Sequence, residues 1–191
     1  MRILVTGGAG FLGSHLCDKL LSLGHSVLAV DNFYTGDQKN IAHLRDNRDF
    51  ELMRHDVTFP LYVEVDGIFN LACPASPIHY QFDPVQTTKV SVIGSINMLG
   101  LAKRTKARIF QASTSEVYGT AQYVPIDEKH PLQPQSPYSA SKIGADAMAM
   151  SFFNAFDLPL TIARPFNTYG PRQSARAVIP TIISQIANGK K

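Results

Sequence analysis

Tyr138 and Lys142 stand four positions apart and form a pattern suited to proton transfer. On a helix, side chains four apart share a face, so this phenol and this ammonium would point into one space. A free tyrosine has a pKa of about 10, and a nearby cation together with the positive end of a helix favours the phenolate. Such a phenolate could take a proton from a hydroxyl group. The same spacing also arises by chance on surface helices.

A second group of reactive side chains lies in residues 113–119, where Thr114, Ser115 and Glu116 follow a short apolar run. A polar turn capped by its own hydroxyl groups would look the same. In an open α/β sheet, however, ligands bind at the carboxyl ends of the strands. If residues 107–112 form such a strand, Glu116 and Tyr138 together supply two groups for proton transfer.

The beginning of the chain, MRILVTGGAGFLGS, predicts a strand, a glycine turn and a helix in direct succession. This order places the amides at a helix N-terminus against a diphosphate. Gly7 would make the tight turn, Gly10 would leave room for the diphosphate, and Gly13 would let the helix pack close to the strand. Taken alone, the motif fits an ordinary glycine-rich turn equally well.

Asp31 favours the dinucleotide interpretation. The apolar run 26–30 predicts a second strand, and Asp31 ends it about 20 residues beyond the glycines, where a carboxylate can accept the hydroxyls of an adenosine ribose. A 2′-phosphate would meet this negative charge, and residues 32–34 hold no arginine to neutralise it. The sequence therefore predicts NAD as cofactor rather than NADP.

The elements that must position these groups alternate between strands and helices. This alternation predicts an α/β fold, a Rossmann-type doubly wound parallel sheet with helices on both faces. We expect an NAD-binding domain over 1–170 and the beginning of a largely missing substrate-binding domain over 171–191. The expected strands are 3–5, 26–30, 50–54, 65–71, 107–112 and 158–163, and the expected helices are 11–21, 84–104, 136–156 and 176–188.

Composition excludes several functional classes. The chain has 191 residues and a net charge of +3 from 18 basic and 15 acidic residues, which are interspersed, so no nucleic-acid partner is expected. No apolar run is long enough to span a membrane, and the first strand begins too early for a secretion signal, so a cytoplasmic location is expected. Cys17 and Cys73 stand far apart and are interpreted as reduced thiols rather than a disulfide. The six histidines show no spacing typical of a metal site.

Two of the expected helices, 84–104 and 136–156, are apolar on more than one face. Deep burial in a monomer would explain this pattern. We expect instead that one face of each helix packs on the sheet and another on a partner subunit, which predicts a homodimer.

Taken together, these motifs resemble the extended short-chain dehydrogenase/reductases, and the chain is similar to their nucleotide-sugar branch over its whole length. The resemblance implies Tyr138 as catalytic base, supported by Lys142, with Thr114, Ser115 and Glu116 beside it. Ser91 stands where many relatives have asparagine. The resemblance implies that the cofactor is bound by Gly7, Gly10, Phe11, Leu12, Gly13, Asp31, Asn32, Asp56, Val57, Leu71, Ala72, Ser91, Tyr138, Lys142 and Pro165. It implies that a nucleotide-sugar substrate is bound by Pro74, Ser76, Thr114, Asn167 and Arg172.

Two subfamilies are represented in different parts of the chain. Residues 1–119, with the stretch 74–77, resemble UDP-glucuronate decarboxylases, whereas residues 120–191 look more like nucleotide-sugar 4,6-dehydratases. Both chemistries begin with oxidation of the sugar C4 hydroxyl by NAD. A C6 carboxylate would then leave as carbon dioxide; with a C6 hydroxyl, Glu116 would remove the C5 proton and water would leave. Ser115 stands where glucose-type dehydratases carry aspartate, and the stretch 74–77 favours decarboxylation.

Other functions remain open at this point. A 4,6-dehydratase or an epimerase would use the same opening step. The chain could also be an NAD-binding fragment or a chimera without turnover, because relatives of this kind continue into a smaller domain that grips the nucleotide and sugar. We therefore expect the chain alone to bind NAD and to convert sugar nucleotides poorly.

Overall fold

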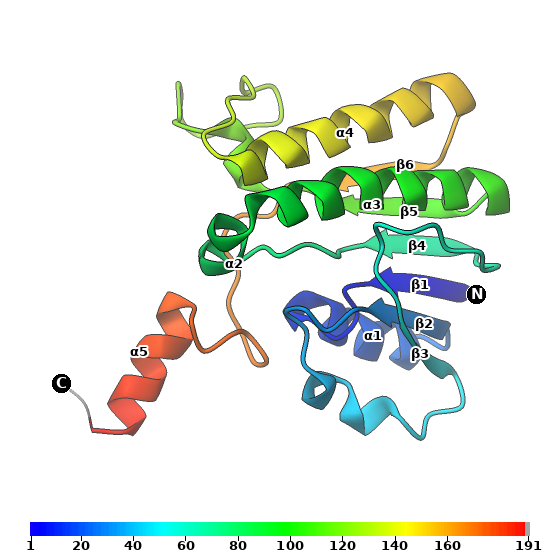
Figure 1. Cartoon of the computed structure of the whole chain (residues 1–191), viewed down its shortest axis with the longest axis horizontal. Coiled ribbons are helices and arrows are strands. Elements are labelled where there is room, and N and C mark those ends of the chain that lie inside the picture. Colours follow the sequence, from blue (N-terminus) through cyan, green and yellow to red (C-terminus); the bar gives the residue numbers. More distant parts are fainter. Residues whose placement is uncertain (190–191) are drawn as a thin grey trace.

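The computed structural model describes residues 1–189, which contain a six-stranded parallel sheet (Figure 1). The strand order is β3-β2-β1-β4-β5-β6, and each neighbouring pair is parallel. This is the strand order of the Rossmann fold. The strands are β1 (Arg2–Thr6), β2 (Ser26–Asp31), β3 (Phe50–Arg54), β4 (Gly67–Asn70), β5 (Arg108–Ala112) and β6 (Leu160–Ala163).

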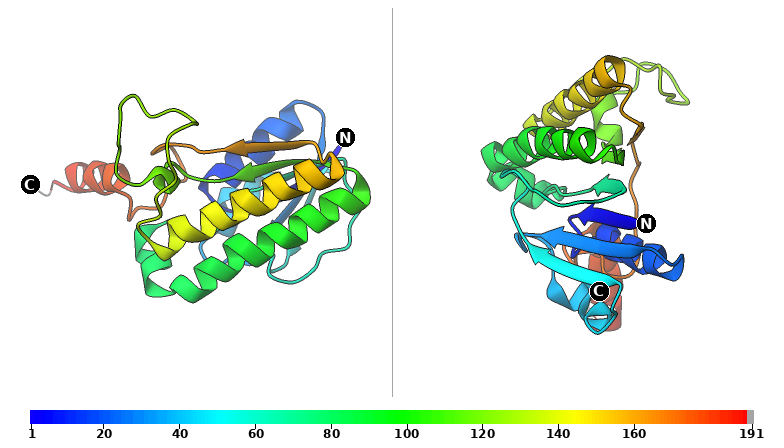
Figure 2. Two further views of the ribbon diagram at one scale, coloured as in Figure 1. Left: turned by 90° about the horizontal axis from the view of Figure 1, so that it is seen from above. Right: turned by 90° about the vertical axis from the view of Figure 1, so that its right-hand side faces the viewer.

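Helices cover both faces of the sheet, as predicted. Figure 2 shows α1 on one face and α3 with α4 on the other, where the last two lie side by side. Three short 3-10 helices lie in the connections. The α-helices are α1 (Phe11–Ser22), α2 (Pro77–Phe82), α3 (Pro84–Thr105), α4 (Pro137–Phe156) and α5 (Val178–Ala187), and the 3-10 helices are η1 (Gln38–Asn40), η2 (Ala42–Leu44) and η3 (Ser115–Tyr118).

The core consists of two apolar layers, one on each face of the strands. Leu4 and Leu28 lie with Met98 of α3 in one layer, and Val5 and Cys17 of α1 belong to the other. Strands buried on both faces must be apolar at consecutive positions. The continuous apolar runs of the sequence therefore correspond to strands that are buried on both faces. The helices between these strands cover the two faces of the sheet.

Most predicted boundaries agree with the structure. β3 has the predicted bounds, and Ser136 precedes α4 as its N-cap. Several elements are shorter than predicted. The largest differences are in β4, expected over 65–71, in β6, expected over 158–163, and in α5, expected over 176–188. The 3-10 helices and α2 were not predicted, because pieces of three to six residues carry no periodic pattern.

The carboxyl ends of all the strands meet at one edge of the sheet, beside α2 and the segment leading to α5 (Figure 1). β1 and β4 are neighbours at the point where the chain reverses its direction of winding. Ligands of doubly wound sheets bind at this switch point. The segments that follow β1, β4, β5 and β6 are therefore the ones to inspect for a site.

Candidate active site

The glycine turn after β1 has the predicted conformation. Gly7 has a φ of 72°, in the left-handed region that favours glycine. A Cβ atom on Gly13 would collide with the Gly7 carbonyl oxygen, so glycine is required there for close packing. No side chain caps the N-terminus of α1, and its first turn, with Phe11 and Leu12, holds no acidic residue. The turn therefore leaves backbone amides available to an anion.

Asp31 at the end of β2 has a structural role that sequence reasoning missed. Its carboxylate accepts hydrogen bonds from the amides of Ala9 (2.9 Å) and Phe33 (2.8 Å). Burial raises the pKa of Asp31, and the two amide hydrogen bonds act against this rise. The carboxylate thus ties the glycine turn to the second strand. A carboxylate has about four acceptor positions, so it can still accept the ribose hydroxyls predicted for it.

Asn32 and Asp56 are brought together beside the ends of β2 and β3. The Asn32 side-chain amide donates to Asp56 (3.2 Å), which also accepts from the amide and hydroxyl of Thr58. Although burial acts to raise it, these hydrogen bonds lower the pKa of Asp56 overall. Val57 is buried next to them. The structure therefore groups three residues predicted to contact the cofactor.

Leu71 and Ala72 follow β4 and face the glycine turn. Their amides lie 3.0 and 3.1 Å from the Thr6 hydroxyl oxygen, to which they donate. A Cβ atom on Gly7 would come within 3.1 Å of the Ala72 backbone. The two segments at the switch point are therefore in contact, as a shared cofactor site requires.

Tyr138 lies in the first turn of α4 and is 5% exposed. The ring of Tyr80, from α2, stacks on it with a centroid distance of 4.7 Å and an interplanar angle of 5°. Burial raises the pKa of Tyr138; Cys73, Glu116 and Tyr80 add to this rise, whereas hydrogen bonding to Thr114 opposes it. The phenol is therefore held neutral in the chain without ligands.

The expectation that Lys142 and the helix terminus favour the Tyr138 phenolate stays a prediction. The Lys142 ammonium lies 5.9 Å from the centre of the Tyr138 ring and donates to the Ala112 carbonyl oxygen (2.9 Å). A capping box between Ser136 and Ser139 occupies amides at the helix N-terminus. Burial of the phenol raises its pKa and therefore acts against the expected effect.

Residues 113–119 follow β5 and contain the 3-10 helix η3 (Ser115–Tyr118). Thr114 caps η3 by accepting from the Glu116 amide (3.2 Å), and the Ser115 amide donates to the Pro165 carbonyl oxygen (3.1 Å). Burial raises the pKa of Glu116. Glu116 and Ser136 line one hollow of about 290 Å³ at the start of α4. The predicted proton-transfer groups therefore lie in one region.

The predicted substrate residues after β4 lie on the approach to α2. Pro74 is buried, and Ser76 is half-buried as the residue before the helix. Ser91 of α3 is buried, with its hydroxyl 3.3 Å from the Cys73 sulfur. Ser91 thus contacts the segment that carries the predicted site; its contact with the cofactor stays a prediction.

The segment after β6 carries three further predicted residues. Pro165 and Asn167 are exposed. Arg172 forms an ion pair with Asp18 of α1 (2.7 Å), and His15 donates to the Pro171 carbonyl oxygen (2.9 Å). The structure therefore places Arg172 against α1, the helix that follows the glycine turn, and not beside Tyr138.

Two other residues near the site were missed. Tyr80 has no local sequence signal, because its stacking on Tyr138 joins elements distant in sequence. Asp146 is buried two turns beyond Tyr138 and pairs with Arg164 (3.1 Å). The spacing of 138, 142 and 146 was the available signal, since such positions share a helix face.

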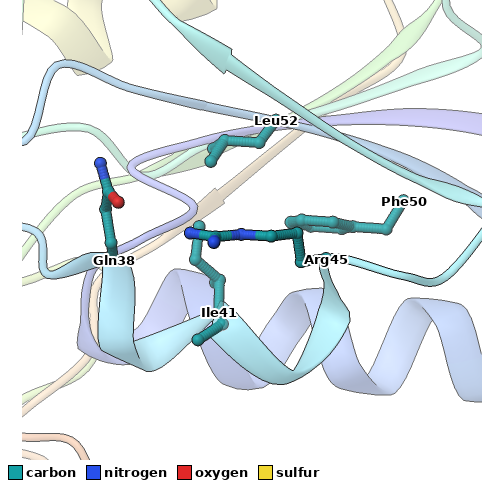
Figure 3. A pocket seen from close by; sticks show the side chains of 6 residues that line it. Gln38, Ile41, Arg45, Phe50 and Leu52 are labelled. Carbon is teal, nitrogen blue, oxygen red and sulfur yellow. The ribbon is translucent and has the colours of Figure 1, made fainter.

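A separate hollow lies away from this region, between η1, η2 and β3 (Figure 3). It measures about 180 Å³ and contains none of the predicted site residues. Among residues 1–189, no group of histidine, cysteine and acidic residues could hold a metal ion, and no helix is long and apolar enough to cross a membrane.

The sequence model of the GDP-mannose 4,6 dehydratase family matches residues 4–191. The chain belongs to this family. It is 51% identical over 177 residues to UDP-glucuronic acid decarboxylase 1 of Arabidopsis thaliana. This alignment covers 90% of this chain and 41% of that protein. It is 46% identical over 197 residues to UDP-glucuronic acid decarboxylase 1 of Xenopus tropicalis, covering all of this chain and 47% of that protein. The chain thus spans about half the length of these relatives.

Solved structures of nucleotide-sugar enzymes have the same fold. A dTDP-glucose 4,6-dehydratase from Streptomyces venezuelae with bound NAD has a TM-score of 0.91 at 31% identity, over 99% of this chain and 63% of that one. A UDP-glucuronic acid 4-epimerase from Bacillus cereus, in complex with UDP-glucuronic acid and NAD, has a TM-score of 0.88 at 29% identity, over 100% of this chain and 64% of that one. The predicted family resemblance and fold class are confirmed.

Proposed function

We propose that this chain is the NAD-binding part of an enzyme that decarboxylates UDP-glucuronate to UDP-xylose. The observation that carries the proposal is the identity of 46–51% to UDP-glucuronic acid decarboxylases over 90–100% of the chain. Residues 1–170 would form the NAD-binding domain, and residues 171–191 would begin the substrate-binding region.

The cofactor site fits NAD in its backbone and its charge. The first turn of α1 is free of acidic residues and side-chain caps, which suits a diphosphate. Asp31 suits a ribose with free hydroxyls, and residues 32–34 hold no arginine for a 2′-phosphate, although Arg54 is the neighbour of Asp31 on β3. NAD, when bound, would accept a hydride from the sugar C4 and return it at the end of the reaction.

The remaining chemistry belongs to side chains of this chain. Tyr138 would take the proton of the C4 hydroxyl, and Lys142 would stabilise the phenolate so formed. Thr114 would hold the sugar by a hydrogen bond, with Ser115 and Glu116 beside it. Because burial raises the pKa of Tyr138 in the chain alone, proton removal requires a positive charge closer to the phenol once ligands are bound.

The substrate would lie along the segments after β4 and β6. Pro74 and Ser76 would contact the sugar, and Asn167 the diphosphate. Arg172 could reach a phosphate only by leaving Asp18, because their ion pair occupies it in the structure. Because the identity to UDP-glucuronic acid decarboxylases carries the proposal, UDP is the proposed nucleotide of the substrate.

A 4,6-dehydratase or epimerase is the second candidate. It is favoured by structures of such enzymes that match 99–100% of the chain at 29–31% identity. All three reactions share oxidation at C4, and they differ in what happens next. The identity to decarboxylases is higher, which decides our preference.

Product analysis distinguishes these reactions. The purified chain is first titrated with NAD and then incubated with NAD and either UDP-glucuronate or a neutral UDP-sugar. The products are analysed by mass spectrometry and NMR. Loss of carbon dioxide from UDP-glucuronate supports decarboxylation. An unchanged mass with an NMR spectrum inverted at C4 indicates an epimerase, and loss of water from the neutral UDP-sugar indicates a dehydratase. NAD binding without any product would leave the chain as a cofactor-binding unit.

A homodimer is the proposed assembly. The outward faces of α3 and α4 carry Ile93, Ile96, Met150 and Phe153, each between 37% and 46% exposed. Exposed apolar side chains on two adjacent helices suit a second copy of the chain. This assembly agrees with the apolar character of both helices in the sequence.

A further inference from the structure

Asp146 is a buried carboxylate that the proposed mechanism does not use. It lies on α4 one turn beyond Lys142 and two turns beyond Tyr138, and it is 3% exposed. Positions four apart on a helix share a face, so all three side chains project from one side of α4. Aspartate is almost never fully buried unless it is paired. Its partners therefore indicate what it does.

The partners of Asp146 come from the ends of two neighbouring strands. Its Oδ2 atom accepts from the Ser113 hydroxyl (2.9 Å), just after β5, and from Arg164 Nε (3.1 Å), just after β6. The Ser113 amide also donates to the Ala163 carbonyl oxygen (2.8 Å). Asp146 therefore joins α4 to both strand ends.

Lys142 holds the same end of β5. Its ammonium donates to the carbonyl oxygen of Ala112 (2.9 Å), the residue before Ser113. Two successive turns of α4 thus bind two successive residues of the chain. Thr114 comes next, so its position relative to Tyr138 depends on this double attachment.

The charges agree with this arrangement. Lys142 is 4% exposed, and a buried ammonium without a counter-charge is costly. Asp146 supplies a negative charge one turn away; its ion pair is with Arg164, and its attraction to Lys142 acts over a longer distance. Its Oδ1 atom is buried without a hydrogen-bond partner in the described part of the chain, and the ammonium has three donor hydrogens. Burial raises the pKa of Asp146, while Ser113, Arg164 and Lys142 oppose that rise.

We infer that Asp146 is a positioning residue, which holds the Lys142 ammonium beside Tyr138 and fixes the end of β5 that carries Thr114. The inference rests on the roles proposed above for Tyr138 and Lys142. It makes Asp146 a part of the site through its effect on another side chain, and it assigns no contact with substrate to the carboxylate.

A purely structural role would have a different signature. Asp146→Asn breaks the buried ion pair with Arg164, so it should lower the urea midpoint of unfolding. Ser113→Ala removes a hydrogen bond from the same carboxylate and keeps its charge. A purely structural role would therefore alter the reactivity of Lys142 equally in both variants.

The test is the acetylation rate of individual lysines at pH 8, measured by peptide mass spectrometry on the folded chain. Asp146→Asn should raise the rate at Lys142 at least threefold, because the ammonium loses its counter-charge. The exposed Lys89 and Lys103 serve as internal standards in the same digest. Asp146→Glu should restore the slow rate. Asp157→Asn makes the same chemical change at the exposed end of α4 and should alter nothing.

Two outcomes would overturn the inference. One is an unchanged rate at Lys142 in Asp146→Asn; the other is an equal acceleration in Ser113→Ala, which removes a hydrogen bond and keeps the charge. If Asp146→Asn does not fold, Arg164→Gln takes its place. This variant removes the other positive charge near Asp146, so Lys142 becomes its main counter-charge. The acetylation rate at Lys142 should then fall or stay the same, and a rise contradicts the inference. No cofactor is needed, so a failed NAD titration would count only against the proposed function.

Discussion

At the scale of single residues, the environment of Tyr138 governs the proposed chemistry. A general base works best with a pKa near the operating pH, whereas burial raises the pKa of this phenol. Tyr80 covers one face of the ring, and the Lys142 ammonium is bound to the Ala112 carbonyl. A positive charge closer to the phenol oxygen would therefore favour ionisation of Tyr138.

Removing the phenol hydroxyl should separate catalysis from binding. Tyr138→Phe is expected to abolish C4 oxidation in an active preparation and to leave NAD affinity nearly unchanged, because only the base is lost. Lys142→Met should impair both, since the resemblance places the ammonium at the cofactor as well. NAD reduction assays and calorimetry provide the two readouts. A Tyr138→Phe variant that still reduces NAD would place the base elsewhere.

The raised pKa of Tyr138 also predicts how stability depends on pH. The folded state favours the neutral phenol, so this contribution is complete below pH 10 and is lost as the pH rises through the pKa of the folded chain. Urea unfolding between pH 8 and about pH 11 should show a smaller alkaline loss for Tyr138→Phe than for the parent chain. Tyr62→Phe, at an exposed position, is the matched control and should retain the full loss.

Asp31 tests the choice of cofactor. Asp31→Ala should weaken NAD binding by about 1.5–3 kcal/mol, the range for hydrogen bonds to charged groups. The amide of Ala9 also loses its acceptor, so the glycine turn should become less ordered. Asp31→Asn keeps an acceptor and should lose less. Calorimetry with NAD and NADP measures both effects, and equal affinity of the parent chain for the two would contradict the assignment.

At the scale of elements, the sequence predicted what depends on local pattern. The apolar runs gave the strands, and Ser136 with Pro137 gave the start of α4. Contacts between distant elements could not be predicted in this way. The stacking of Tyr80 on Tyr138 requires α2, which is six residues long and carries no periodic pattern. The pairing of Asp146 with Arg164 requires β5 and β6 to be neighbours.

The capping box of α4 is expected to contribute measurably to stability. Ser136 accepts from the Ser139 amide (3.0 Å), and the Ser139 hydroxyl accepts from the Ser136 amide (3.0 Å). Ser136→Ala should lower the free energy of unfolding by about 1 kcal/mol, as for other N-caps. Urea denaturation measures the change. Ser22→Ala, at the exposed end of α1, should stay within about 0.5 kcal/mol of the parent chain.

At the scale of the whole molecule, the face of the sheet that carries α3 and α4 is the proposed dimer interface. α3 and α4 lie side by side (Figure 1). Both helices carry exposed apolar side chains, among them Ile93 and Phe153. Substituting Ile93→Glu and Phe153→Glu together should shift a dimer to monomers, because two charges would be buried unpaired at the interface. Analytical ultracentrifugation over a concentration series provides the measurement.

A control for this experiment is available elsewhere on the molecule. Leu23→Glu changes an exposed apolar residue after α1, away from both helices, and should leave the oligomeric state unchanged. A parent chain that sediments as a monomer at every concentration would contradict the proposed dimer.

The parallel arrangement of the strands also has a consequence for protein engineering. Since all carboxyl ends meet at one edge, the proposed site combines Tyr138 and Lys142 of α4 with short connections, among them residues 71–76, 113–119 and 164–172. The strands supply packing and the connections can vary, so one scaffold can host different chemistries. Replacing a single connection by that of a dehydratase or an epimerase is therefore expected to alter the chemistry of the site while the core of the sheet stays intact.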